Sequence, residues 1–154
     1  MVRDALCLDP LLARWTEQNR LVAICPEVMA GASIPRAPSE IVGAGGGAAI
    51  LQGQAYIINK IGQDVTLVYK RGAELALQVA KQYAVKLAIL KENSPSCGSQ
   101  KIYDGSFSGK LIAQQGVTAA LLKQNGVKVF NEHQLAEAEC YLQQLEAKNQ
   151  LFQG

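Results

Sequence analysis

The sequence predicts an α/β fold, a Rossmann-like three-layer domain with a small, mostly parallel sheet and helices on both faces. Short apolar segments alternate with amphipathic helical segments along the 154 residues, and such alternation is typical of a parallel sheet covered on both sides. The composition is 49% apolar and 18% charged, as in folded chains and unlike disordered ones. A chain of this length buries about two-thirds of its unfolded surface, so we expect a single domain over residues 1–154.

The first predicted elements are a helix and a strand. Asp9 is a suitable helix cap and Pro10 fits a first helical turn, which predicts a helix from there to about Asn19. Residues 21–24 are apolar and predict a strand that has Cys25 at its carboxyl end.

The next stretch carries weaker signals. Residues 29–47 contain prolines and a glycine-rich run and are expected to be irregular. Residues 43–48 match the G-x-G-x-x-A dinucleotide pattern, but residues 49–53 do not have the character of the helix that this motif requires, so no dinucleotide site is expected. Residues 54–61 predict a short strand or one half of a hairpin.

The second half of the chain carries the strongest signals. After Asp64, apolar residues recur at intervals of three and four up to Tyr83, which predicts a long amphipathic helix. Asn131 and Gln134 resemble a capping box at the start of the last helix. The other expected elements are a strand at 86–91, a long loop to residue 109, a helix at 116–126, a strand at 127–130 and a last helix that ends near Ala147.

Polar segments follow two of the predicted strands. Cys25-Pro26-Glu27 follows the strand at 21–24, and residues 92–97 follow the strand at 86–91. Ligands of open α/β sheets bind beyond the carboxyl ends of the strands. We therefore expect Cys25, Glu27 and Cys97 to lie at one rim of the sheet.

Charge and hydropathy exclude several classes of function. The net charge is +2 and no block of like charges occurs, so a duplex-binding protein is not expected. No apolar run reaches the ~20 residues that cross a bilayer, and the N-terminus lacks a signal-peptide core. A cytoplasmic location is expected.

The four cysteines are expected to be thiols, because the compartment is expected to be reducing. They form no C-x-x-C pair, so a zinc knuckle is not expected. Cys97, in a polar loop, is interpreted as a metal or cluster ligand, with a buried structural thiol as the alternative. A Cys-His hydrolase is disfavoured because the single histidine, His133, belongs to the start of the last helix. Cys25 is either a ligand or the last apolar residue of its strand. Structural roles are favoured for Cys7 and Cys140.

Two further residues are candidates for ligand contacts. Arg36, between two prolines, either contacts an anion or carbonyl-rich ligand or is solvated. Tyr103, in the long loop, either shapes a pocket or anchors the loop.

Several motifs together resemble the bacterial family known as domain of unknown function 523 (YbbK-like), which includes the thiouracil desulfidases. The resemblance covers residues 11–140. It is carried by Cys25-Pro26-Glu27, Ile34-Pro35-Arg36-Ala37-Pro38-Ser39-Glu40-Ile41, Gly62-Gln63-Asp64-Val65-Thr66, Lys91-Glu92-Asn93-Ser94-Pro95-Ser96-Cys97-Gly98, Ile102-Tyr103-Asp104-Gly105-Ser106-Phe107-Ser108-Gly109 and Gly116-Val117-Thr118-Ala119-Ala120-Leu121-Leu122.

The resemblance implies a [4Fe-4S] enzyme that replaces the sulfur of a thiolated pyrimidine, such as 2-thiouracil, by oxygen and releases sulfide. Three cysteines hold such a cluster and leave one iron open; two of them correspond to Cys25 and Cys97. Glu27 and Ser94 correspond to the catalytic acid and serine. The residues expected to contact the substrate are Arg36, Ser96 and Tyr103.

One part of the family pattern is missing from the sequence. The family begins with a strand that ends in Cys-Leu-Leu-Gly and supplies the third thiolate, whereas here Cys7-Leu8 is followed at once by Asp9-Pro10. We therefore expect weak cluster binding, with Cys7 as a possible substitute, and an exposed strand edge that favours homo-oligomers. The alternative function is a non-enzymatic module that has lost the cluster and binds a small anion or nucleotide.

Overall fold

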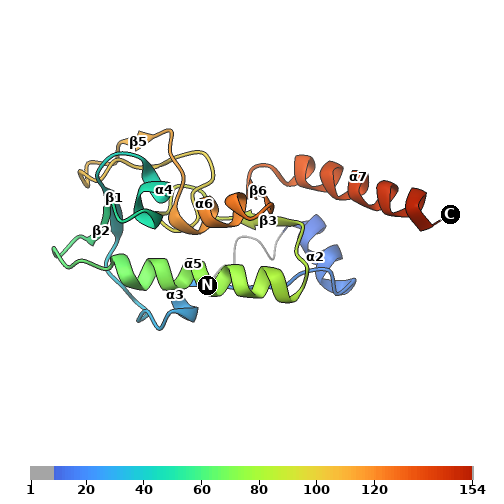
Figure 1. Cartoon of the computed structure of the whole chain (residues 1–154), viewed down its shortest axis with the longest axis horizontal. Helices are drawn as coiled ribbons and strands as arrows, with labels where there is room; N and C mark the ends of the chain where they lie inside the picture. The colour runs from blue at the N-terminus through green and yellow to red at the C-terminus, as the bar shows by residue number, and fades with distance from the viewer. Residues whose placement is uncertain (1–8, 154) are drawn as a thin grey trace.

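The computed structural model describes residues 9–153 and confirms the predicted α/β architecture (Figure 1). The helices are α2 (Pro10–Glu17), α3 (Pro26–Met29), α4 (Gly46–Leu51), α5 (Thr66–Gln82), α6 (Val117–Gln124) and α7 (Leu135–Gln153). The strands are β1 (Ser39–Val42), β2 (Tyr56–Asn59), β3 (Leu87–Leu90), β4 (Ile102–Tyr103), β5 (Leu111–Ile112) and β6 (Lys128–Asn131). None of the helices in this part of the chain has the length and apolar character that a bilayer-spanning helix needs.

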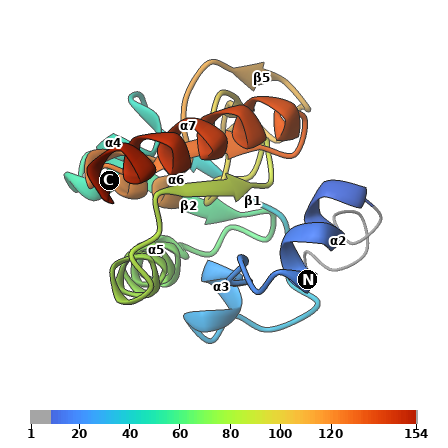
Figure 2. The same cartoon turned by 90° about the vertical axis from the view of Figure 1, so that its right-hand side faces the viewer.

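The parallel part of the fold is the pair β3 and β6, in which Leu87 lies opposite Lys128 and Leu90 opposite Asn131. Successive side chains of a strand point to opposite faces, and each face of β3 is covered. Leu87 and Ile89 pack on a cluster from α2, α7 and β6, whereas Ala88 and Leu90 pack on a cluster from α5 and α6. Figure 2 shows β3 between α5 and α7, as the predicted three layers require.

Two antiparallel pairs complete the strands. β1 pairs with β2, and β4 pairs with β5. A buried cluster joins both pairs to the helices; its members are Ile41, Ala49, Ile50, Ala55, Ile57, Tyr69, Ala73, Ile102 and Val117. The long loop after β3 is therefore anchored in the core through Ile102.

The strand predicted at residues 21–24 is wrong. The segment has no regular secondary structure, and Leu21 and Val22 are 41% and 43% exposed. Among residues 9–153 no strand pairs with it, and β3 pairs with β6 alone. An apolar segment becomes a strand only where a neighbour supplies ladder hydrogen bonds, so the parallel sheet is smaller than the pattern suggested.

The irregular structure predicted for residues 29–47 is wrong in part, because β1 and the start of α4 form there. Residues 49–51, which were not expected to be helical, complete α4. Helix α4 forms despite its glycines because Ala49 and Ile50 are buried in the core. Its glycines also allow close packing, since a Cβ on Gly47 would lie 2.3 Å from the Gly116 carbonyl oxygen. Tertiary contacts thus override weak helix propensity.

The remaining predicted elements are found close to their expected bounds. The Asp64 carboxylate accepts the Thr66 N–H at 2.9 Å where α5 begins. The Asn131 N–H donates to the Gln134 side chain at 3.1 Å, which is one half of the predicted capping box. The other half is absent from the described structure, because the Asn131 side chain accepts the His133 N–H and α7 begins only at Leu135. Helix α7 continues to Gln153, past the predicted end, and its last turns extend away from the rest of the chain (Figure 1).

Candidate functional site

Cys97 lies in a tight turn whose backbone is held by the side chain of Ser94, three residues earlier. The Ser94 Oγ accepts the N–H groups of Ser96 at 3.1 Å and Cys97 at 2.9 Å. The Gly98 N–H closes the turn on the Ser94 carbonyl oxygen at 2.9 Å. Because the Ser94 oxygen accepts two hydrogen bonds, its hydroxyl has one proton left to donate, and a side-chain hydrogen bond from Ser94 is one of the effects that tend to lower the pKa of Cys97.

Helix α6 begins directly against this turn. The N–H groups of Val117 and Thr118 donate to the carbonyl oxygens of Pro95 and Ser96, both at 2.8 Å. Such close contact requires a residue without a side chain at Gly116, where a Cβ would lie 2.5 Å from the Ser96 backbone. The first N–H groups of the helix, which lack partners within it, therefore fix the cysteine turn.

Ser96, predicted to contact the substrate, is completely buried. Its hydroxyl pairs with the Thr118 hydroxyl at 2.8 Å and accepts the Cys97 thiol at 3.5 Å. In this position Ser96 connects the Cys97 thiol to Thr118 of α6.

Cys25 and Glu27 lie where the irregular segment enters α3. Cys25 occupies the N-cap position of this short helix, and Pro26 and Glu27 form its first turn. The segment packs closely on α5, where a Cβ on Gly72 would lie 2.5 Å from the Pro26 carbonyl oxygen.

The Glu27 carboxylate is held by two side chains. The Arg36 Nε donates to Glu27 Oε2 at 2.5 Å, and the Tyr69 hydroxyl donates to the same oxygen at 3.1 Å. Burial tends to lower the pKa of Arg36, but the charge and the hydrogen bond of Glu27, together with smaller contributions from Cys25 and Tyr69, outweigh burial and raise the pKa. Arg36, predicted to contact the substrate, therefore faces Glu27.

Tyr69 is the site residue that the sequence analysis missed. It belongs to the helix predicted after Asp64, where it counts only as one of the unnamed apolar positions. It is 6% exposed, and burial, supported by the Glu27 charge, raises the pKa of its hydroxyl to about 12. A buried tyrosine needs a hydrogen-bond partner, and this requirement is the signal that could have indicated a polar neighbour.

The two cysteine segments lie within electrostatic reach of each other. Burial is the main cause that raises the pKa of Cys97 to about 11, and the charges of Glu27 and Cys25 add to it. The Cys25 charge also acts on Arg36. Cys25, Glu27, Arg36 and Cys97 thus form one group, which we call the cysteine rim.

The cysteine rim offers two thiols to a metal or cluster. Cys25 and Cys97 are both free and partly buried, and a neutral buried thiol becomes a thiolate readily only when a metal replaces its proton. Among residues 9–153 no group of three or more histidine, cysteine or acidic side chains is arranged to hold a metal ion. The described residues therefore fit two ligands of a cluster and supply no third; Cys7 lies outside them.

The remaining candidates are Tyr103 and Cys140. Tyr103 is 36% exposed in β4, and the described structure contains no hydrogen bond between its hydroxyl and the cysteine rim. Cys140 is exposed on α7.

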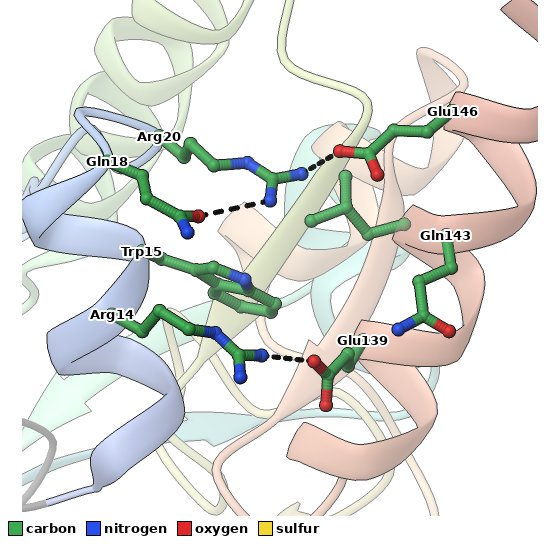
Figure 3. Close-up of a pocket in the computed structure, with 8 residues that line it drawn as sticks. Arg14, Trp15, Gln18, Arg20, Glu139, Gln143 and Glu146 are labelled. Carbon is green, nitrogen blue, oxygen red and sulfur yellow. Dashed lines mark hydrogen bonds and ion pairs between the residues drawn. The ribbon is translucent and has the colours of Figure 1, made fainter. Parts of the chain in front are cut away.

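A hollow between α2 and α7 is separate from the cysteine rim (Figure 3). Arg14 pairs there with Glu139, and Arg20 pairs with Glu146. Trp15 is buried between these two pairs. Because both arginines are already paired with carboxylates, the hollow joins two helices and offers no free charge to a ligand.

Comparisons with known proteins agree on one family. The model of the 2-thiouracil desulfurase family matches residues 3–134. The uncharacterized protein YbbK of Bacillus subtilis (strain 168) is 48% identical over 124 residues, which cover 80% of this chain and 82% of that protein. The solved structure of the [4Fe-4S]-dependent thiouracil desulfidase TudS is 39% identical with a TM-score of 0.79, over 88% of this chain and 83% of that one.

Proposed function

Because the chain belongs to the 2-thiouracil desulfurase family, we propose that it replaces the sulfur of a thiolated pyrimidine, such as 2-thiouracil, by oxygen. Water supplies the oxygen, the C=S bond becomes C=O, and sulfur leaves as hydrogen sulfide. Carbon keeps its oxidation state, so no external electron donor or acceptor is needed. The observation that supports the proposal is that Glu27 and Cys25 lie near enough to Cys97 for their charges to act on its pKa, which burial mainly raises.

Cys25 and Cys97 are the proposed thiolate ligands of a [4Fe-4S] cluster. When bound, such a cluster supplies a Lewis-acidic iron suited to the soft sulfur of a C=S group. The two thiols come from different segments, so folding of the rim must precede their joint use. The third ligand lies outside residues 9–153 or is replaced by a solvent or substrate atom.

Glu27 is the proposed general base. Both of the hydrogen bonds that the described residues make to its carboxylate reach Oε2, so Oε1 remains free to accept a proton from water. Arg36 and Tyr69 fix the orientation of the carboxylate, which keeps the free oxygen directed consistently. In this proposal Arg36 acts on the substrate only through Glu27.

Ser94 is the proposed hydrogen-bond donor to the substrate. Two N–H groups already donate to its oxygen, and hydrogen bonds in such a chain strengthen one another. Its hydroxyl proton can therefore stabilise negative charge as it develops on the pyrimidine. Ser96 supports Cys97, and Tyr103 is proposed to border the ring of the substrate from β4.

The alternative, a cluster-free module that binds a small anion or nucleotide, has less support. It depends on the amides of the loop around Cys97 and on Arg36, but the N–H groups of Ser96, Cys97 and Gly98 already donate to Ser94. The Arg36 Nε likewise donates to Glu27. The pairing leaves the rim without an unpartnered arginine among its described members.

The test begins with anaerobic reconstitution of the full chain with iron and sulfide. Iron content and the broad visible absorbance of the cluster should be lost in Cys25→Ser and Cys97→Ser and retained in Glu27→Gln and in Cys140→Ser, the matched control. Sulfide release from 2-thiouracil should then fall by about 10²-fold or more in Glu27→Gln. A reconstituted cluster without sulfide release from any thiolated pyrimidine would contradict the proposed reaction.

A further inference from the structure

Glu92, the second residue after β3, collects backbone hydrogen bonds from the segment that follows Cys97. Its Oε1 accepts the N–H groups of Ser99 at 2.8 Å, Gln100 at 3.1 Å and Lys101 at 3.1 Å. Three successive N–H groups therefore converge on one carboxylate oxygen.

The second oxygen of Glu92 accepts side-chain donors. Oε2 accepts the Ser99 hydroxyl at 2.9 Å and the Asn131 amide nitrogen at 2.6 Å. Asn131 is 4% exposed, and its Oδ1 accepts the His133 N–H at 2.9 Å. This last bond fixes the amide so that its NH₂ group faces Glu92.

The charge of Glu92 matches this environment. Burial alone would raise its pKa, but the N–H groups of Lys101 and Gln100, followed by Ser99 and Asn131, outweigh burial and lower it. A carboxylate can accept at both oxygens, whereas a glutamine can accept at only one. The site is thus built for an ionised acid.

We propose that Glu92 is a positioning residue for Cys97. Ser94 fixes the backbone before the thiol, and Glu92 fixes the backbone after it, so that the sulfur is held from both sides. The consequence for cluster binding rests on the proposed function, whereas the position of the thiol can be tested without iron.

The test exchanges donor and acceptor in the hydrogen bond between Asn131 and Glu92. In Glu92→Gln, the new amide can still accept the backbone N–H groups, but its NH₂ faces the NH₂ of Asn131. In Asn131→Asp, two carboxylates face each other. In the double variant, the amide of residue 92 donates to the carboxylate of residue 131, which restores complementarity.

The readout is the rate at which iodoacetamide alkylates Cys97 in the iron-free full chain, followed by peptide mass spectrometry. Cys140 is exposed and serves as an internal standard for reagent and pH. Loss of a charge-assisted hydrogen bond should make local opening of the segment around Cys97 about tenfold more frequent. We expect Cys97 to react about tenfold faster in each single variant and within about threefold of the wild type in the double variant.

Glu132→Gln is the matched control, because it makes the same chemical change at a residue that contacts the backbone of Glu92 and not its carboxylate. Glu132 accepts the Glu92 N–H at 2.8 Å, and a glutamine can accept that bond equally well. Its Cys97 alkylation rate should equal that of the wild type.

The alkylation rate of Cys25 distinguishes a positioning role of Glu92 from general destabilisation of the fold. Faster alkylation of Cys97 but not of Cys25 in Glu92→Gln supports the proposal. Equal acceleration of both thiols, an unchanged Cys97 rate, or a double variant that reacts as fast as the single ones would overturn it. Because these rates are measured without iron, a failure of desulfidase activity leaves them unaffected and counts against the proposed function alone.

Discussion

The two cysteines of the rim are presented in different ways. Cys97 lies in a turn bonded to α6 on one side and to Ser94 within the turn. Cys25 follows an irregular segment whose Leu21 and Val22 are exposed, and no side chain caps α3. Local hydrogen bonds thus determine the position of Cys97, whereas packing against α5 determines that of Cys25. The following changes test this difference, from the largest expected effect to the smallest.

Gly116→Ala should have the largest effect on stability. The added Cβ would lie 2.5 Å from the Ser96 backbone, in a turn that hydrogen bonds prevent from moving. We expect a loss of about 3 kcal/mol or more in the free energy of unfolding, measured by urea denaturation. Gly109→Ala is the control, because that site is open and has a φ of +83°, so only backbone strain of about 1 kcal/mol applies.

Gly72→Ala should have a smaller effect although the clash is similar. The added Cβ would lie 2.5 Å from the Pro26 carbonyl oxygen, but the segment before Cys25 lacks a strand partner among the described residues and can shift. We expect a loss of about 1–2 kcal/mol and a changed alkylation rate at Cys25 with none at Cys97. A loss as large as that of Gly116→Ala would mean that the two segments are equally rigid.

Acid should reduce the stability of the segment that holds Cys97, because Glu92 becomes protonated. Its pKa is lower in the folded state than in the unfolded state, so its stabilisation is present above the unfolded value and disappears as the pH falls through the folded one. The effect is below about 1 kcal/mol because the group is partly solvated. Unfolding free energies measured below about pH 4.3 should therefore fall more steeply in the wild type than in Glu92→Gln; parallel curves would show that Glu92 does not contribute.

The ion pair between Arg20 and Glu146 should have the smallest effect. It connects the start of the irregular segment to α7, but both side chains are substantially exposed, at 33% and 51%. A double-mutant cycle with Arg20→Gln and Glu146→Gln should give a coupling energy of about 0.2–0.5 kcal/mol. A coupling several times larger would indicate that this pair, and not Pro26 packing, determines the path to Cys25.

The sequence was most informative where periodicity and burial coincide. Helix α5 and strands β3 and β6 followed from apolar spacing, because their faces are covered as that spacing requires. The segment at 21–24 has the same apolar character but no ladder partner in the described structure, and this partner is a tertiary property. Helix α4 was missed for the opposite reason, since burial of Ile50 outweighs its glycines.

The site shows the same division. The position after β3 indicated Cys97 as a candidate, whereas Cys25 and Glu27 were indicated through a strand that does not form, and the packing of the Pro26 segment on α5 places them instead. The roles of Tyr69 and Glu92 could not be predicted in this way. Glu92 mostly contacts backbone N–H groups, which every non-proline residue carries and which therefore leave no trace in the sequence.

The one-sided pairing of β3 has a consequence for how its backbone is solvated. Alternate N–H groups of a parallel strand point to opposite edges. β6 pairs with one edge of β3, and no other described strand pairs with the second edge. Among residues 9–153, about half of the β3 peptide groups therefore have no strand partner for their hydrogen bonds. The strand that leads to Cys97 is stabilised more by the side chains above and below it than by its own ladder.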